Sequence, residues 1–189
     1  MFWFCTINDA FFRTEKASGM ATKPTLYLDT NIVSMLHYRG AHAMARVQHQ
    51  LTVDWWKYER GHFQLVASQW TEDELSDGYY SGQSAALAAV RRLRYLPRTA
   101  DVLRCATCLT DAGVVPKTKL GDAIQLAFAT IHRIDYLLTW NFAHLANVQV
   151  QHNMDALNRR QGWWSPLLVS PQTIPWASLG QEIGRKHER

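Results

Sequence analysis

A short run of strand-forming residues that ends on an acid constrains the fold of this chain most strongly. Residues 25–28 favour a strand with apolar Leu26 and Leu28, and three good helix N-cap residues follow, Asp29, Thr30 and Asn31. The pattern predicts a buried strand that runs directly into a helix. In an open parallel α/β sheet such junctions lie at the carboxyl ends of the strands, where ligand sites gather. A carboxylate there is placed to bind a metal or a phosphate group, although Asp29 could equally serve only as a helix cap.

Strands and helices alternate along the rest of the chain. Further strands are predicted at 63–68, 134–139 and 166–170. Helices are predicted at 31–38, 42–60, 70–75, 84–96, 100–109, 118–132, 141–146 and 154–161. This alternation predicts an α/β fold with three α/β/α layers, in which a central, mostly parallel sheet has crossover helices on both faces.

The composition bounds the domain organisation. The chain has 189 residues, of which 47% are hydrophobic and 19% charged, which is typical of one globular domain large enough for a covered sheet. Met20 would make a natural start just before the first strand, and residues 1–19 begin with aromatics but lack the basic region of a signal peptide. We therefore predict a disordered N-terminal extension over residues 1–19 and a single domain over residues 20–189.

Charge and cysteine usage bound the partners and the compartment. The 20 Lys and Arg residues against 16 Asp and Glu give a net charge of +4, which suits RNA but is shared by many proteins that bind none. Three cysteines are too few for a disulfide framework and indicate a reducing cytoplasm, and the Cys105/Cys108 pair lacks the partners of a zinc site. Charges interrupt every apolar run before it reaches the length of a membrane span, so no transmembrane helix is expected.

Four polar residues follow predicted strand ends or lie early in the helices beyond them. Asp29 ends the first strand, and Glu74 lies in the helix after the second. Asp122 lies in the first turns of a later helix, and Asn141 follows the third strand. Each also has a structural role open to it. Glu74 could complete a capping box with Thr71, Asp122 could interact with the helix dipole, and Asn141 could cap a helix.

Taken together, these residues belong to four motifs in a fixed order. The motifs are Tyr27-Leu28-Asp29-Thr30-Asn31, then Ser68 with Glu74-Leu75, then Gly121-Asp122-Ala123 with Ala127, and then Tyr136-Leu137-Leu138-Thr139-Trp140-Asn141. Their order and spacing resemble the PIN-domain ribonucleases, and most closely the VapC-like toxins of type II toxin–antitoxin systems. The resemblance covers roughly residues 24–172 and implies a PIN-like three-layer domain.

The resemblance implies a metal-dependent endoribonuclease that hydrolyses phosphodiester bonds in single-stranded regions of RNA. The metal-binding and catalytic residues implied by position are Asp29, Glu74, Asp122 and Asn141, and the supporting residues are Thr30, Asn31 and Thr139. It also implies a homodimer that is inhibited by a small antitoxin protein.

The donor chemistry agrees with Mg²⁺ or Mn²⁺ as the cofactor. These cations prefer oxygen ligands, keep several waters and need few carboxylates, and they activate water for phosphodiester hydrolysis. Asn141 stands where the family usually has a fourth acid, and its amide oxygen brings no charge, so a second metal position should be weakened. Gln125, about one helical turn after Asp122, is placed to face the same site, whereas Asp135 lies at the opposite end of its strand.

Two other functions stay open. Asn141 motivates a catalytically weak PIN-like module that binds RNA or a protein partner without cleavage. The junction at Leu28-Asp29-Thr30 also suits an aspartyl phosphatase, in which Asp29 would be phosphorylated. That chemistry usually needs a second acid two residues further on, where this chain has Asn31.

Overall fold

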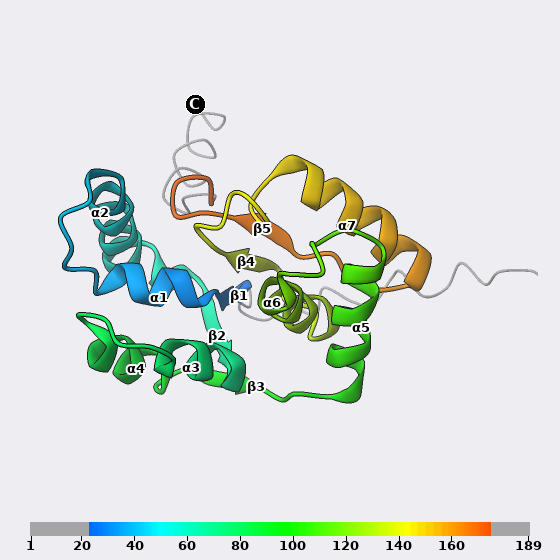
Figure 1. The fold of residues 1–189 in the computed structure, drawn as a ribbon, viewed down its shortest axis with the longest axis horizontal. Helices are drawn as coiled ribbons and strands as arrows, with labels where there is room; N and C mark the ends of the chain where they lie inside the picture. The colour runs from blue at the N-terminus through cyan, green and yellow to red at the C-terminus, as the bar shows by residue number, and fades with distance from the viewer. Residues whose placement is uncertain (1–22, 175–189) are drawn as a thin grey trace, which may run out of the picture.

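A five-stranded parallel sheet forms the centre of the described part of the molecule (Figure 1). The computed structural model describes residues 23–174, so the extension predicted at residues 1–19 lies outside it. The strand order is β3-β2-β1-β4-β5, and every neighbouring pair is parallel. The strands are β1 (Thr25–Leu28), β2 (Gln64–Ser68), β3 (Arg94–Leu96), β4 (Tyr136–Leu138) and β5 (Leu167–Val169).

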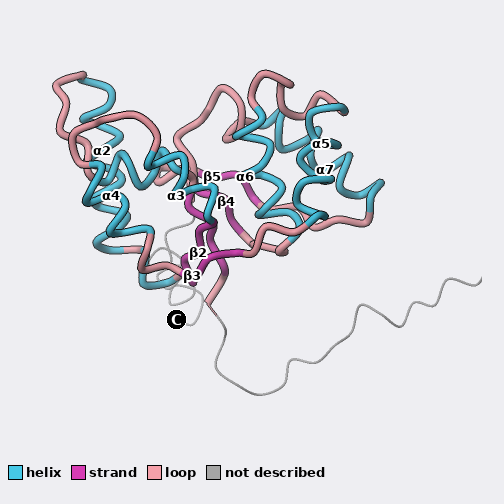
Figure 2. The backbone as a smooth tube through the Cα atoms, turned by 60° about the horizontal axis from the view of Figure 1, so that its bottom comes forward, coloured by secondary structure: helices cyan, strands magenta, loops and turns pink. Residues whose placement is uncertain are grey.

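Helices cover both faces of the sheet, as Figures 1 and 2 show. One layer consists of α1 (Thr30–Leu36), α2 (Ala43–Tyr58), α3 (Gln69–Ser76) and α4 (Gln83–Val90), with the short 3-10 helix η2 (Arg60–His62) after α2. The other layer consists of α5 (Ala100–Asp111), α6 (Leu120–Ile131) and α7 (Val148–Gln161). The predicted α/β fold with three layers is therefore confirmed, and the sheet is parallel throughout rather than mostly parallel.

The central strand β1 connects two apolar cores, one on each face of the sheet. Successive side chains of a strand point to opposite faces. Leu26 and Leu28 pack into one core with Ile32 of α1, and Tyr27 packs into the other. There the ring of Tyr27 stacks on that of Phe128 in α6, with ring centroids 6.1 Å apart. All three β1 side chains are fully buried, so both layers of helices are needed to cover this strand.

Helix α6 is buried along most of its length. Every residue from Ala123 to Thr130 is buried, because α6 packs between the sheet and α5. A helix that is covered on all sides can place a charged side chain only near its ends. Asp122 occupies such a place in the first turn of α6. No helix within residues 23–174 is long and apolar enough to span a membrane.

The structure corrects the predicted helices at 84–96, 141–146 and 154–161. The first is α4, which ends at Val90, followed by β3, whose short edge strand pairs with β2. Residues 141–146 form turns, in which the carbonyl of Asn141 accepts hydrogen bonds from two later backbone N–H groups. Helix α7 already begins at Val148, because the side chain of Asn147 caps it by accepting from the N–H of Val150 at 2.9 Å.

Candidate active site

The strand order reverses beside β1. From β1 the chain continues through β2 and β3 on one side of the sheet, and through β4 and β5 on the other. In open parallel sheets, ligands bind outside the carboxyl ends of the strands at such a reversal. Asp29 follows β1 directly, and Thr139 and Asn141 follow β4. These three predicted site residues therefore lie at the crevice that the topology favours.

Asp29 is a buried carboxylate with dense hydrogen bonding. Its side chain is 3% exposed, and its Oδ2 accepts from the amide of Asn31 at 2.5 Å and from the hydroxyl of Thr139. Burial raises the pKa of Asp29 to about 6, and the negative charge of Glu74 also raises it. The hydrogen bonds of Thr139 and Gln125 lower the same pKa, so the site partly offsets the cost of the buried charge.

Asn31 connects β1, β4 and the chain beyond β4. Its amide nitrogen also donates to Thr139 Oγ1 at 3.0 Å, and its amide oxygen accepts from the N–H of Trp140 at 2.9 Å. Thr139 Oγ1 in turn accepts from the N–H of Asn141 at 2.9 Å. Asn31 and Thr139, both predicted as supporting residues, therefore hold the carboxylate of Asp29 in one orientation.

Glu74 reaches the site from α3. Its Oε2 accepts from the hydroxyl of Thr30 at 2.5 Å and from the amide of Gln125 at 2.8 Å. Its Oε1 lies so close to Gly121 that a Cβ added there would be 2.7 Å away. Only glycine fits beside this carboxylate without displacing it. The motif that contains Gly121 did not predict this role, although a glycine in the first turn of a strong helix, directly before an acid, is a usable signal.

Asp122 and Asn141 form the second part of the site. Burial raises the pKa of Asp122, whereas a hydrogen bond with Asn141 and the nearby His144 and Lys119 lower it. The Oδ2 atom of Asp122 is buried and has no hydrogen-bond partner within the described residues. The Oδ1 atom of Asn141 accepts from the N–H of His144 at 3.0 Å. Hydrogen bonds thus hold both the backbone N–H and the side chain of Asn141.

The four predicted residues come together as two linked groups rather than as one cluster. Gln125 contacts both Asp29 and Glu74, so it bridges the two acids of the first group. Asp122 pairs with Asn141 in the second group, and the hydrogen bond from Asn141 to Thr139 joins the groups. Within residues 23–174 no three His, Cys, Asp or Glu side chains lie close enough to share a metal ion.

The capping box predicted for α3 is wrong. Ser68, and not Thr71, caps the helix, since its hydroxyl accepts from the N–H of Thr71 at 3.4 Å. The Thr71 hydroxyl instead lies 3.0 Å from the Tyr27 hydroxyl, which is 2.6 Å from Ser68 Oγ. Glu74 is therefore free of the capping role and turns its carboxylate toward Thr30.

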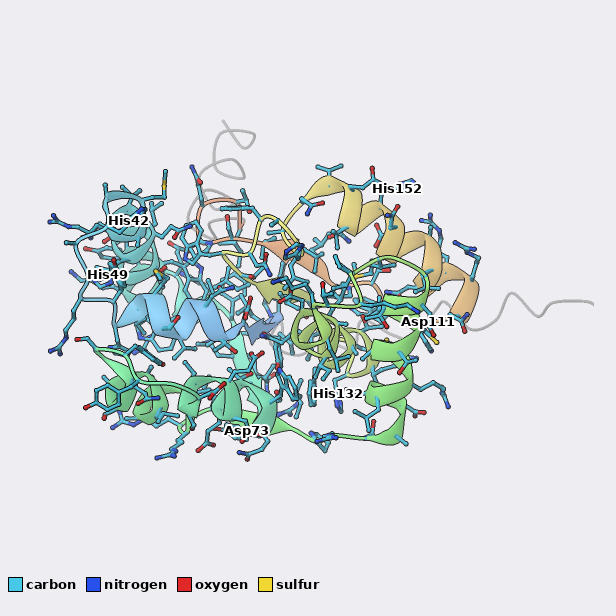
Figure 3. The ribbon with its side chains drawn as sticks, in the orientation of Figure 1. His42, His49, Asp73, Asp111, His132 and His152 are labelled. Carbon is cyan, nitrogen blue, oxygen red and sulfur yellow. The ribbon has the colours of Figure 1, made fainter. Side chains whose placement is uncertain are left out.

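The cysteines and histidines of residues 23–174 do not build an alternative centre. Cys105 and Cys108 are free thiols on α5, and burial in the apolar core raises the pKa of Cys105 to about 12. Figure 3 shows His42, His132 and His152 on different parts of the molecule. Their separation leaves the crevice beside β1 as the place where functional groups from several elements meet.

The fold and the site define an α/β protein with an acidic crevice at the reversal point of a parallel sheet. No protein-family model, no curated protein and no solved structure matches the chain. The resemblance to PIN-domain ribonucleases therefore rests on the four motifs, and it stays a prediction for this chain.

Proposed function

We propose that this protein is a metal-dependent endoribonuclease that hydrolyses phosphodiester bonds in single-stranded regions of RNA. The observation that carries the proposal is the link between Asp29 and Glu74 through Gln125 beside the carboxyl end of β1, with Asp122 joined to this pair through Asn141 and Thr139. These acids come from three separate segments, and Gln125 links the first two of them. Their order along the chain is the order in the PIN-domain ribonucleases, which the sequence resembles.

The residues of the crevice fit a hard divalent cation. All the donors are oxygens of carboxylate, amide or hydroxyl groups, which are the ligands of Mg²⁺ and Mn²⁺. Among the described residues Asp122 has a buried Oδ2 without a partner, and burial raises the pKa of Asp29. A cation beside Asp122 would satisfy its Oδ2, and a cation beside Asp29 would favour the ionised carboxylate. Mg²⁺ is usually held by one or two carboxylates and several waters, so three gathered acids are not required.

Each residue then has a defined task. Asp29 and Glu74 in one group, or Asp122 with Asn141 in the other, would hold the cation together with waters. When bound, Mg²⁺ or Mn²⁺ supplies an activated water and neutralises charge on the phosphate. Asn31, Thr139 and Gln125 keep the carboxylates oriented through the hydrogen bonds described above. Outer residues of this kind commonly change metal affinity by about 10–100-fold when they are removed.

The proposal extends to the biological setting that the resemblance implies. It makes the protein the toxin of a toxin–antitoxin pair in a reducing cytoplasm, where a homodimer is inhibited by a small antitoxin protein. The net charge of +4 supports an RNA substrate, because cations on the surface attract the phosphate backbone.

The test is cleavage of a labelled, partly single-stranded RNA pool by the purified protein, with Mg²⁺, with Mn²⁺ and with chelator. Wild type should cleave only with metal. Asp29→Asn should cleave at least about 100-fold more slowly, because a lost metal interaction is worth several kcal/mol. Asp135→Asn makes the same change at the other end of the sheet and serves as the control. Equal cleavage by wild type and Asp29→Asn would contradict the proposal.

A second candidate function is an RNA-binding or partner-binding module without nuclease activity. Asn141 favours it, because the family position normally holds an acid and an amide lowers the charge of the site. This candidate requires wild type to bind RNA without metal-dependent cleavage. Asn141→Asp would then be the variant that restores cleavage.

A further inference from the structure

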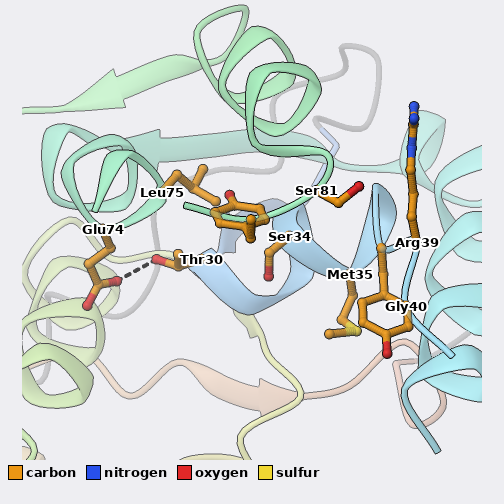
Figure 4. Close-up of a pocket in the computed structure, with 10 residues that line it drawn as sticks. Thr30, Ser34, Met35, Arg39, Gly40, Glu74, Leu75 and Ser81 are labelled. Atoms are coloured by element: carbon orange, nitrogen blue, oxygen red, sulfur yellow. Dashed lines mark hydrogen bonds between the residues drawn. The ribbon is translucent and has the colours of Figure 1, made fainter. Parts of the chain in front are cut away.

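A cavity of about 470 Å³ lies between α1 and the α3–α4 segment (Figure 4). Glu74 and Thr30 line one end of it, and Arg39 and Gly40 line the other. Its remaining walls come from Ser34, Met35, Tyr38, Leu75, Tyr80 and Ser81. This volume lies within the range of about 300–1,000 Å³ that is usual for small-ligand sites.

The cavity shares Thr30 and Glu74 with the candidate active site. These two residues are hydrogen-bonded to each other at one end of the lining, as Figure 4 shows. Glu74 also borders a second cavity of about 660 Å³, together with Trp70 and Gly121. An RNA strand that passes Glu74 would therefore have space on both sides of this carboxylate.

The walls of the cavity combine aromatic rings with unused polar groups. Tyr38 and Tyr80 contribute two rings to a mostly apolar lining. The Tyr80 hydroxyl is buried without a hydrogen-bond partner among the described residues. Arg39 is exposed at the mouth and forms no ion pair within residues 23–174. A neighbouring cavity of about 510 Å³ shares Arg39 and Tyr80 and adds the fully exposed Tyr79.

Close backbone contacts hold the walls in place. Gly82 has φ +97°, and a Cβ added to it would lie 2.3 Å from the carbonyl oxygen of His37 at the end of α1. The amide of Gln83 donates to the carbonyls of Leu75 at 3.0 Å and Gly78 at 3.1 Å, which ties the loop after α3 to that helix. The cavity is therefore part of the framework and not a gap between loose loops.

We propose that this cavity binds an unpaired nucleobase of single-stranded RNA beside the candidate active site. The inference rests on the proposed ribonuclease function and names the part of the substrate that the enzyme grips. A base has a flat face for the tyrosine rings and a polar edge for the Tyr80 hydroxyl, and its backbone brings a phosphate to Arg39. An apolar peptide side chain would leave the buried Tyr80 hydroxyl without a partner and would not use the exposed charge of Arg39, so the wall chemistry favours a nucleotide over an apolar protein segment.

The test is photocrosslinking and binding of a short single-stranded RNA that carries 4-thiouridine, in chelator so that cleavage plays no part. The crosslink should map to a peptide that contains Tyr38 or Tyr80. Tyr80→Leu should weaken RNA binding by about 5–150-fold, since stacking on one ring is worth about 1–3 kcal/mol per base. Tyr80→Phe keeps the ring and should lose less affinity. Tyr58→Leu, at an exposed tyrosine of α2 outside the cavity, is the control.

A second variant, Arg39→Gln, tests the exposed positive charge of the cavity lining and does not disturb the core. Arg39→Gln should reduce the slope of log affinity against log salt by about 0.7, the value for one phosphate contact on a single strand. Arg159→Gln makes the same change on the exposed end of α7 and should leave the slope unaltered.

The outcomes separate the cavity from the nuclease. Pocket crosslinks and weaker binding by Tyr80→Leu, without metal-dependent cleavage by wild type, would support the base site and contradict the nuclease. The base site alone would be overturned if wild type cleaves RNA, the crosslinks map elsewhere and both variants keep their affinity. A protein segment would then be the favoured occupant of the cavity. Absence of RNA binding by wild type would also overturn the base site.

Discussion

The carboxyl group of Asp29 lies at the carboxyl end of β1, where its ionised form has lost most of its hydration. Two side-chain donors, Asn31 and Thr139, meet its Oδ2, and Glu74 adds a second negative charge nearby. Burial outweighs the hydrogen bonds, since the pKa rises from 3.8 to about 6. Relative to the unfolded chain, folding therefore favours the protonated form, and at neutral pH, where the group is mostly ionised, its buried charge costs folding free energy.

We predict that Asp29→Asn removes a pH-dependent loss of stability. A carboxyl group whose pKa is raised on folding contributes stability below its unfolded pKa near 3.8, and that stability is lost as the pH rises through about 6. The full loss is about 3 kcal/mol for a shift of about two units. Wild type should thus lose more unfolding free energy between pH 4 and pH 8 than the variant, which urea denaturation measures. Equal pH profiles would show that Asp29 does not carry the raised pKa.

Gly121 offers a second test at a single residue. In Gly121→Ala the new Cβ would lie 2.7 Å from Glu74 Oε1, so the carboxylate must move, whereas alanine favours the helix by up to about 1 kcal/mol. We expect an unchanged or higher melting temperature together with about 10–100-fold weaker Mn²⁺ binding, measured by calorimetry. Gly61→Ala has no atom within 4 Å of its Cβ and should change neither quantity. Wild-type Mn²⁺ affinity in Gly121→Ala would remove Glu74 from the metal site.

At the scale of elements, the α3–α4 segment determines the shape of the cavity beside Glu74. Its loop approaches α1 at Gly82, which combines a left-handed backbone with contact to the carbonyl oxygen of His37. Because that contact is to backbone, no side-chain rotation can relieve it. The wall of the cavity therefore depends on this glycine and on the hydrogen bonds of Gln83.

We predict that Gly82→Ala destabilises the protein by about 1–3 kcal/mol, because strained backbone and overlap act together. For a chain of this size that corresponds to a fall in melting temperature of roughly 2–12 °C. Gly113→Ala is the matched control, since Gly113 has φ +70° but no atom within 4 Å of its Cβ. The close approach predicts a larger loss in Gly82→Ala than in Gly113→Ala. Equal losses would assign the effect to backbone conformation alone.

The elements also show which parts of the fold were predictable from sequence. Strand β1 and helix α6 have strong local patterns, a strand ending in three cap residues and a long apolar helix, and both were predicted. Strand β3 was not, because residues 84–96 carry helix-like apolar spacing and the last three form a strand only through pairing with β2. Residues 141–146 were predicted as a helix because Asn141 is a good cap. Its side chain does accept from the N–H of His144 as a cap would, but the segment makes only turns before α7 begins.

The candidate site was predictable to the same extent. The strand-end positions of Asp29 and Asn141 follow from the local sequence, whereas the supporting roles of Asn31 and Thr139 were implied by the family resemblance. The strand order that places β1 beside β4 is not contained in any local pattern. The packing of Gly121 against Glu74 joins α3 to α6 across nearly fifty residues of chain, and no local pattern contains such a contact. The same holds for the bridge that Gln125 makes between Glu74 and Asp29, although its position one turn after Asp122 was a correct pointer.

At the scale of the whole molecule, one end of the parallel sheet carries the candidate site and the other end is held by hydrogen bonds between strands. The carboxyl ends of β1 and β4 carry Asp29 and Thr139 and face the crevice. At the opposite ends, Asp135 accepts from the N–H and the hydroxyl of Thr25, both at 2.8 Å, and its N–H donates to Thr25 Oγ1 at 3.0 Å. These contacts join the start of β1 to the start of β4. Asp135 therefore stabilises the sheet at this end, whereas Asp29 at the other end belongs to the candidate site.

This division predicts that Asp135→Ala separates stability from activity. The variant loses two hydrogen bonds to a partly buried carboxylate, so we expect the unfolding free energy to fall by about 1–3 kcal/mol. Cleavage per folded molecule, measured well below the melting temperature with Mg²⁺, should stay within about twofold of wild type, because no group at the carboxyl end of the sheet is touched. Asp29→Asn should show the reverse, with slow cleavage and no loss of stability near pH 8. Asp135→Ala could instead remain folded and cleave as slowly as Asp29→Asn. Cleavage would then depend equally on both ends of the sheet, and the assignment of the site to the carboxyl ends of β1 and β4 would be wrong.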